Sequence, residues 1–300
     1  MVYILMATYN GEGYIQKQID SVIHQTYQEW KLLVHDDGST DRTLEIVREF
    51  DDKRISILED GVVFGSSTGN FLHLTRYVGA EATYFCFCDQ DDLWAPEKIE
   101  VQLSTIAKFE DHGVPICVYS DLSLIDEKDS LIHASFWRYS SINSRPSFMF
   151  LFLENSLTGC TMMMNRKVLD YLRGVSHMDV VQHDWLIGLI CASDGVLEPI
   201  SKPLVNYRQH TRNEVGARRQ QIAEHLLSRG VVSRLRKIFK LRGKIIKQLR
   251  EVRESVVNPA SKRVISRYVE KLWLYKPVFI GQGLYRSKTV IGSIAKVILY

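Results

Sequence analysis

Short apolar runs alternate with amphipathic stretches over the first 126 residues. The runs have the length and the β-branched and aromatic content of strands, and they cover residues 2–7, 30–35, 54–59, 83–88 and 115–126. Between them, apolar residues recur at helical spacing over residues 15–23, 41–50, 68–78 and 96–109. This strand–helix repetition predicts an α/β fold with a doubly wound, mostly parallel sheet flanked by helices.

Polar residues at the helix ends predict where two of these helices begin. Ser39 or Thr40 precedes the helix with Asp41 in its first turn, and either hydroxyl suits an N-cap. Pro96 is expected at the first position of the fourth helix, where no N–H is needed.

The pattern becomes irregular between about residue 140 and residue 210. It predicts a short helix, a β segment around Gly159–Met164 and another helix, followed by a helix over 183–193 and an extended strand over 198–210. The methionines of the β segment are expected to pack in the core.

Charge divides the chain near residue 210. Residues 1–210 hold 17 Lys and Arg against 30 Asp and Glu, a net charge of −13, whereas residues 211–300 hold 21 against 5, a net charge of +16. We expect one domain over 1–210, with halves 1–120 and 121–210, and a basic helical region over 211–300.

Such a basic region favours a polyanionic partner. No nucleic-acid recognition motif accompanies it, so we expect no nucleic-acid partner. Residues 231–253 alternate apolar and basic side chains, as helices at a membrane surface do, and anionic lipid attracts each basic residue by about 1 kcal/mol. A solvated helix packed on the domain is the alternative. The oligomeric state stays open.

The five cysteines indicate a reducing compartment. Their number is odd and they lie mostly in apolar runs, so we expect buried thiols and no disulfide framework. The first residues lack the basic start of a signal peptide, and no apolar stretch is long enough to span a membrane. We therefore expect a cytoplasmic protein, held at the inner face of the plasma membrane by its basic region.

Carboxylates follow two of the predicted strands directly. Asp36 and Asp37 come after the second strand, and Asp89, Asp91 and Asp92 come after the fourth. The carboxyl ends of parallel strands meet at one edge of a sheet, where ligands bind. Like charges this close repel one another, so the arrangement favours a bound cation at that edge.

Asp-x-Asp after a buried strand suits a hard divalent ion. Two carboxylates supply oxygen ligands to Mg²⁺ or Mn²⁺, and a diphosphate fills further positions. The alternative is a helix cap, a role that Asp92 alone can fill. One aspartate of "DDGS" can accept hydrogen bonds from a pyrimidine N3–H or a ribose hydroxyl, although an Asx turn explains the same residues equally well.

Three ordered motifs carry a resemblance to a known family. "ILMATYNGEGYIQKQIDSVIHQTY", "LLVHDDGSTDRT" and "FCDQDDLWAPEKIE" resemble the family-2, inverting glycosyltransferases of GT-A fold over about residues 1–210. Within that family, "DQDDLW", "HDW" at 183–185 and "YRQH" followed by "VGA" resemble bacterial rhamnosyltransferases that build cell-wall or capsular polysaccharide.

The resemblance implies a nucleotide-sugar-binding half over 1–120, an acceptor-side half over 121–210, and roles for individual residues. Asp184 inherits the part of catalytic base, Asp91 with Asp89 binds the metal, and His210 is a further candidate ligand. His183 stands where family members usually carry Glu, and with Trp185 it is placed on the acceptor side. The residues implied in nucleotide-sugar binding are Thr8, Tyr9, Glu12, Asp36, Asp37, Asp89, Gln90 and Arg208. Asp184 as the N-cap of a helix is the alternative for that residue.

The reaction implied is a single displacement at an anomeric carbon. A divalent ion, Mg²⁺ or Mn²⁺, neutralises the leaving diphosphate, and a carboxylate accepts the proton of the attacking hydroxyl. The donor implied is dTDP-rhamnose and the acceptor a lipid-linked or polysaccharide chain. A UDP-hexose or UDP-N-acetylhexosamine donor is the first alternative. A non-catalytic scaffold that binds sugar nucleotide or lipid is the second.

Overall fold

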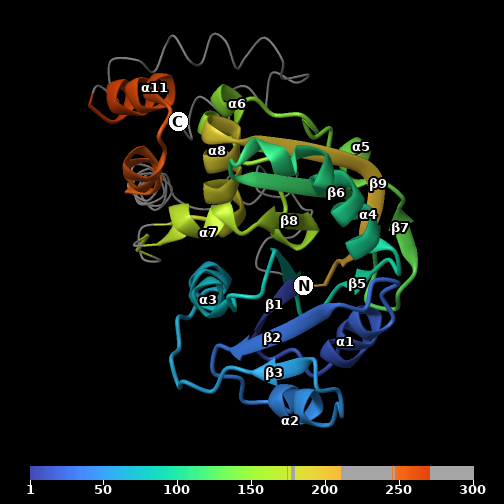
Figure 1. Ribbon diagram of the computed structural model, residues 1–300. Helices are drawn as coiled ribbons and strands as arrows, with labels where there is room; N and C mark the ends of the chain where they lie inside the picture. The colour runs from blue at the N-terminus through green and yellow to red at the C-terminus, as the bar shows by residue number, and fades with distance from the viewer. Residues whose placement is uncertain (174, 177–179, 211–244, 246, 271–300) are drawn as a thin grey trace, which may run out of the picture.

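The computed structural model describes most of the α/β domain and part of the basic region. The described residues are 1–173, 175–176, 180–210, 245 and 247–270 (Figure 1). Most of the basic region, including the closing apolar stretch 289–300, lies outside them, so its predicted helices and membrane contact stay predictions.

The first half of the sheet is parallel, as predicted. The strands β1 (Val2–Thr8), β2 (Trp30–Asp36), β3 (Ile55–Ile57) and β4 (Tyr84–Asp89) lie in the order β3-β2-β1-β4. Thr8 lies opposite Asp36, and Ala7 opposite Asp89. The register therefore brings the polar ends of these strands to one edge of the sheet.

The second half makes the sheet mixed. β8 (Met162–Asn165) runs antiparallel between β4 and β6 (Ile116–Ile125), and β9 (Val196–Arg208) runs parallel to β6. β5 (Leu93–Trp94) pairs antiparallel with β9, and β7 (Leu131–His133) forms a hairpin with β6. The turn at 126–130 is too short for a parallel crossover, so β7 returns antiparallel to β6.

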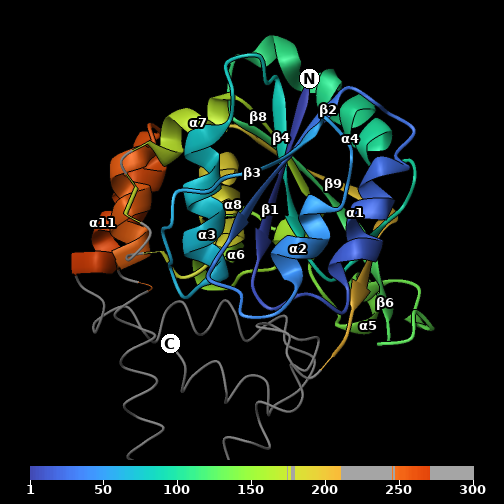
Figure 2. The same ribbon diagram turned by 90° about the horizontal axis from the view of Figure 1, so that it is seen from below.

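Helices cover both faces of the sheet, as Figure 2 shows along the strands. α1 (Ile15–Ile23) and α4 (Lys98–Ile106) pack on one face, and α3 (Ser67–Leu74), α7 (Lys167–Leu172) and α8 (His183–Asp194) pack on the other. The remaining helical elements are α2 (Thr43–Arg48), η1 (Thr75–Tyr77), η2 (Ala107–His112), α5 (Phe136–Tyr139), α6 (Phe148–Leu153), η3 (Gly159–Thr161) and α11 (Pro259–Glu270).

Alternation along the strands divides the core into two layers. In β4, Phe85 and Phe87 join the layer under α3 and α8, whereas Cys86 and Cys88 join the layer under α1 and α4. All five cysteines are buried free thiols, which confirms that part of the prediction. Met162 and Met164 pack on one side and Met163 on the other, so the methionine run is core.

Two predicted helix starts, at Ser39 or Thr40 and at Pro96, were wrong; the helix predicted over 183–193 does begin at His183, but Asp92 and Asp184 do not cap helices as the alternatives had it. Arg42 is the N-cap residue of α2, while the hydroxyl of Ser39 is bound to Asp36. α4 begins at Lys98, two residues after Pro96, and the Asp92 carboxylate accepts from the backbone N–H of Arg208 instead of capping that helix. The N-cap of α8 is Gln182, so Asp184 lies inside its first turn.

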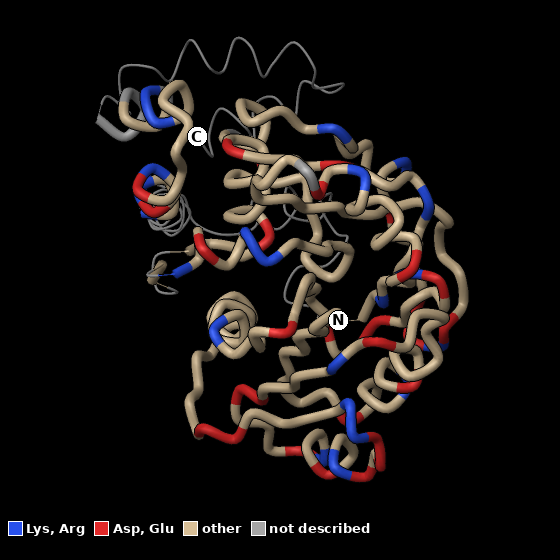
Figure 3. Tube along the Cα trace, viewed as in Figure 1, with Lys and Arg blue, Asp and Glu red and all other residues tan. Residues whose placement is uncertain are grey.

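The described C-terminal residues pack on the domain. Ile245, Leu249 and Val252 belong to the same buried cluster as Leu186 and Ile190 of α8. Lys and Arg lie on both C-terminal helices, 247–255 and α11, in Figure 3. Within the described residues, no helix is long and apolar enough to cross a membrane.

Candidate active site

The carboxylate of Asp36, at the end of β2, is surrounded by donors. It accepts from Thr8 Oγ1 at 2.7 Å, from Ser39 Oγ at 2.6 Å and from the backbone N–H groups of Gly38 and Ser39 at 3.1 and 2.7 Å. These four bonds match the acceptor sites of a carboxylate, so Asp36 closes an Asx turn. The turn reading of "DDGS", left open by the sequence, therefore holds for this residue.

Asp37 anchors a different loop. Its buried carboxylate accepts from the backbone N–H groups of Phe64 and, at 3.0 Å, of Ser66. The segment between β3 and α3 is thereby fixed against the end of β2. A cavity of about 380 Å³ lies between them, lined by His35, Asp36, Gly38, Leu44, Arg48, Ile57, Leu58, Glu59, Gly61, Val62 and Val63.

The loop after β1 is held by an amide. Gln90 Oε1 accepts from Tyr9 N at 2.9 Å and Gln90 Nε2 donates to Tyr9 O at 2.8 Å. A Cβ on Gly11 would lie 2.2 Å from Gln90 Oε1, so glycine is required for this approach. Glu12 accepts from Arg42 N at 3.0 Å. Gln90 and Glu12 thus position the loop, while the Tyr9 ring is 57% exposed at its tip.

Asp91 and His210 meet although 119 positions separate them. His210 Nε2 lies 2.8 Å from Asp91 Oδ2, and its ring stacks on Tyr14 with centroids 5.0 Å apart. Arg208 is buried, donates from Nε to Asp91 O at 2.8 Å and lies 5.0 Å over the Tyr14 ring. Tyr14 is a neighbour that the motifs did not indicate.

Asp89 lies in a second acidic group with Asp92 and Cys160. One ligand atom of each lies within 4.8 Å of the others. Burial, and then the charges of Asp91 and Asp89, raise the pKa of Asp92 well above its usual range. A divalent ion would relieve that repulsion. The carboxylates of Asp89 and Asp92 suit a hard cation, whereas Cys160 does not, and Asp91 of the predicted Asp-x-Asp pair is not a member of this group.

A buried lysine lies under this group. The Lys98 ammonium lies 3.8 Å over the Trp94 ring and donates to Gln102 Oε1 at 2.9 Å. Burial lowers the pKa of Lys98, and nearby Cys86, Cys88, Cys160 and Asp92 oppose that shift. Gln102 in turn donates to Thr161 O at 2.7 Å, next to Cys160.

Asp184 is buried in the first turn of α8. Its Oδ1 accepts from Asn155 Nδ2 at 3.0 Å and from Trp185 N at 2.6 Å, and the Gly159 backbone also donates to the carboxylate. Burial raises the pKa of Asp184 to about 6, against the opposing effect of these bonds. Because Cys160 follows Gly159, the same segment reaches from Asp184 to Asp89 and Asp92.

His183 and Trp185 are core residues on either side of Asp184. The His183 ring lies 4.5 Å from Phe71 and 4.7 Å from Phe87, and neither ring nitrogen has a hydrogen-bond partner among the described residues. Burial lowers the pKa of His183 to about 3, so it is neutral. Trp185 is buried and donates from its indole N–H to Leu151 O at 2.5 Å.

A glutamine from the C-terminal region supports the start of α8. Gln248 is buried, and its Oε1 accepts from Val181 N at 2.7 Å and from Gln182 N at 3.3 Å. No sequence motif indicates this residue, because a polar position in an amphipathic basic helix is expected to face water. Asn155 was also missed, and its place just before the "SLTGC" loop is the only local signal.

A mixed α/β sheet with carboxylates at one edge and a half-buried Asp-x-Asp pair defines a transferase of nucleotide-activated sugars. The glycosyl transferase family 2 model matches residues 3–173. The chain belongs to glycosyl transferase family 2, and its fold is GT-A.

Two relatives illustrate the range of the family. The chain is 30% identical over 225 residues to dTDP-rhamnosyl transferase RfbG of Shigella flexneri, covering 71% of this chain and 74% of the relative. It is 40% identical over 108 residues to the Escherichia coli UDP-Glc:alpha-D-GlcNAc-diphosphoundecaprenol beta-1,3-glucosyltransferase WfgD, covering 36% and 42%. The second match thus spans less than half of either protein.

Solved structures share the fold at low identity. S. aureus TarS 1-349 in complex with UDP-GlcNAc has a TM-score of 0.57 and 16% identity, with 93% of this chain and 78% of that chain covered. Mannosyltransferase PcManGT from Pyrobaculum calidifontis, in complex with GDP-Man and Mn²⁺, has a TM-score of 0.56 and 16% identity, with 100% and 80% covered.

Proposed function

We propose that this glycosyltransferase moves L-rhamnose from dTDP-rhamnose to a lipid-linked or polysaccharide acceptor, with inversion. The observation that carries the reaction is the placement of Asp184. Gly159 donates to its carboxylate, and the next residue, Cys160, lies within 4.8 Å of Asp89 and Asp92. The rhamnose donor is supported by the likeness to RfbG.

Asp184 is the proposed general base. With a pKa raised to about 6, its carboxylate is mostly ionised at pH 7 and still basic enough to accept a proton. An acceptor hydroxyl oxygen forms the new bond to the anomeric carbon as the bond to the diphosphate oxygen breaks. The hydroxyl proton goes to Asp184, and the bonding electron pair leaves with the diphosphate.

Asp91, Asp89 and His210 are the residues proposed to hold a divalent ion. Mg²⁺ or Mn²⁺ would supply positive charge to offset the charge that develops on the diphosphate. Arg208 holds the Asp91 backbone through its Nε, and Tyr14 supports the His210 ring, so both side chains orient the ligands. Thr8 contributes by donating to Asp36, and Gln90 contributes by holding the Tyr9 backbone.

The acceptor is proposed to arrive at a membrane surface. The net charge of +16 over residues 211–300 favours anionic lipid, and WfgD acts, by its name, on a diphosphoundecaprenol-linked sugar. The proposal places the protein at the inner face of the membrane without a nucleic-acid partner.

A donor panel tests the proposal. The full chain is incubated with a lipid-linked acceptor and dTDP-rhamnose, UDP-glucose, UDP-galactose or UDP-N-acetylglucosamine, with Mg²⁺ or Mn²⁺ or with excess chelator. We expect turnover with dTDP-rhamnose, loss of turnover with chelator, and loss of metal-dependent nucleotide binding in Asp91→Ala. Preferred use of UDP-glucose would instead favour the donor of WfgD. Binding of every donor without turnover of any would support the scaffold alternative.

A further inference from the structure

Two histidines and an aspartate converge in the nucleotide-binding half, away from the Asp89–Asp92 group. His35 lies in β2, Asp60 follows β3 and His73 lies in the last turn of α3. One ligand atom of each lies within 4.8 Å of the others. His35 Nε2 is 3.2 Å from Asp60 Oδ1, and His73 Nε2 is 2.5 Å from Asp60 Oδ2.

The protonation of His35 is fixed by Asn70. Asn70 Nδ2 donates to the His35 backbone O at 3.1 Å, which turns Asn70 Oδ1 toward His35 Nδ1 at 2.8 Å. His35 Nδ1 must therefore carry the proton, because Asn70 Oδ1 can only accept. The flipped amide would place Asn70 Oδ1 against the His35 backbone O, which is also an acceptor. The Nε2 of a neutral His35 then directs its lone pair at the Asp60 carboxylate.

Two acceptors facing each other in a buried site require a cation between them or a charged ring. Both histidines are more than nine-tenths buried whereas Asp60 is an exposed residue, so an ion could reach the three ligand atoms from the side of that carboxylate. An imidazole whose other N–H is held by a carbonyl is also the usual arrangement of a metal ligand. Asn70 thus holds the His35 ring in the orientation that a metal ligand needs.

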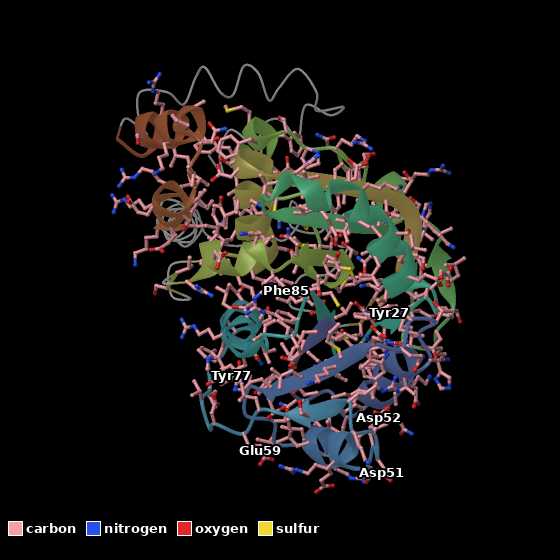
Figure 4. The ribbon with its side chains drawn as sticks, in the orientation of Figure 1. Tyr27, Asp51, Asp52, Glu59, Tyr77 and Phe85 are labelled. Atoms are coloured by element: carbon pink, nitrogen blue, oxygen red, sulfur yellow. The ribbon has the colours of Figure 1, made fainter. Side chains whose placement is uncertain are left out.

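The spacing suits a tetrahedral ion. Bonds of about 2.0–2.2 Å from zinc to nitrogen and oxygen place neighbouring ligand atoms about 3.3 Å apart. The 3.2 Å between His35 Nε2 and Asp60 Oδ1 agrees with that value, whereas the 2.5 Å between His73 Nε2 and Asp60 Oδ2 is a hydrogen-bond length, so this second pair would have to separate around the ion. The Tyr77 hydroxyl donates to Asp60 Oδ2 at 3.2 Å, and Figure 4 shows Tyr77 and Glu59 at the same edge of the molecule.

We propose that His35, Asp60 and His73 form a zinc site distinct from the Asp-x-Asp site. Two imidazoles and one carboxylate favour a late first-row divalent ion, whereas carboxylates at the strand edge favour Mg²⁺ or Mn²⁺. Water or Tyr77 completes the coordination.

The site would fasten a loop beside the cavity that Asp36 lines. Asp60 begins the segment whose other end is held by Asp37 through Phe64 and Ser66. Val62 and Val63, between these two attachments, line the cavity and are exposed. An ion at Asp60 would therefore fix the wall of the cavity from the side of α3, as a structural metal does.

Zinc binding to the full chain tests the site. Chelator-treated protein is dialysed against Zn²⁺ in excess Mg²⁺, and bound zinc is measured by mass spectrometry. We expect about one zinc per chain in the wild type and in Asp91→Ala, and at least tenfold weaker binding in Asp60→Asn and His73→Gln. His24→Gln, at an exposed histidine, is the matched control and should bind as the wild type does.

X-ray absorption at the zinc edge of the wild type tests the site without a variant. Nitrogen and oxygen scatterers with the signature of two imidazoles and no sulfur would support the proposal, and sulfur would assign the ion to Cys160. No zinc uptake, or equal uptake by Asp60→Asn, overturns it. Because binding is read directly, these outcomes do not depend on whether rhamnose is transferred.

Discussion

The carboxylates in the two halves of the domain differ in whether hydrogen bonds or burial dominate their surroundings. In the nucleotide half, Asp36 and Asp37 accept from five backbone or hydroxyl groups of neighbouring loops plus the Thr8 hydroxyl. In the acceptor half, burial dominates and raises the pKa of Asp184 to about 6. The first pair holds the shape of a binding site, and the other residue is suited to exchange a proton.

An acidic residue in a motif can be engaged by the protein's own backbone. Asp36 fixes a turn and Asp37 fixes the loop before α3. Asp184 also accepts hydrogen bonds, but its burial outweighs them and raises its pKa toward neutrality, which suits a group that accepts a proton. The predictions below separate the two roles.

Asp184→Asn should have the largest effect. An amide cannot accept the proton, so kcat should fall by about 10²–10⁴-fold while nucleotide binding is retained. Initial rates and calorimetric titration of the nucleotide measure the two quantities. Asp170→Asn, on an exposed face of α7, is the control. Turnover of Asp184→Asn at the wild-type rate would show that the base assignment is wrong.

Asp37→Ala should act on stability. Two backbone N–H groups lose their acceptor in a buried site, which costs about 2–4 kcal/mol of the free energy of unfolding. Urea denaturation measures the change. The exposed Asp51→Ala should change the free energy of unfolding by less than about 0.5 kcal/mol. Equal stability of the two variants would mean that Asp37 does not anchor the loop.

The pH profile should report Asp184. The ionised form is active, so kcat/KM falls as pH drops through a pKa of about 6, by about tenfold between pH 7 and pH 5. Nucleotide binding measured over the same range corrects for any loss of donor affinity. A corrected profile that is flat from pH 5 to pH 7 contradicts the raised pKa.

His183→Leu should change how stability depends on pH. The folded pKa of about 3 lies below the ordinary 6.5, so the unfolded chain binds the extra proton and the wild type loses stability as pH falls below 6.5. The variant should gain about 2 kcal/mol relative to the wild type between pH 7 and pH 5. Urea denaturation at both pH values tests this, with His24→Leu as the exposed control.

Gln248→Leu should have the smallest effect. Val181 N and Gln182 N lose their acceptor, which loosens the start of α8 and should lower kcat about threefold to tenfold with little change in nucleotide affinity. Arg250→Gln, exposed on the same helix, is the control. An equal decrease in both variants would point to the membrane surface instead of to Asp184.

The edge of the sheet could be predicted because strand ends and carboxylates are adjacent in the sequence. Asp36, Asp89 and Asp91 follow apolar runs, and the parallel register brings the ends of β2 and β4 to the same edge. The helix caps could not be predicted from the sequence. Ser39 donates to Asp36 and Asp92 accepts from the Arg208 backbone, and neither caps a helix. Capping is a local preference that tertiary contacts override.

The long-range contacts had no sequence signal. Asp91 and His210 were paired by resemblance, but the Tyr14 ring between α1 and His210 was not foreseen. His35, Asp60 and His73 each read as an ordinary core or loop residue when taken singly. Gln248 lies in the basic region, for which the sequence predicted only a net positive charge. Its role as acceptor for the backbone at the start of α8 appears only in the packed structure.

Lys98 affects the balance of charge inside the fold when no ion is bound. An ammonium group sealed under Trp94, within the field of Asp92, partly balances the carboxylates from inside the fold. We therefore expect the chain to close its sheet without a bound divalent ion.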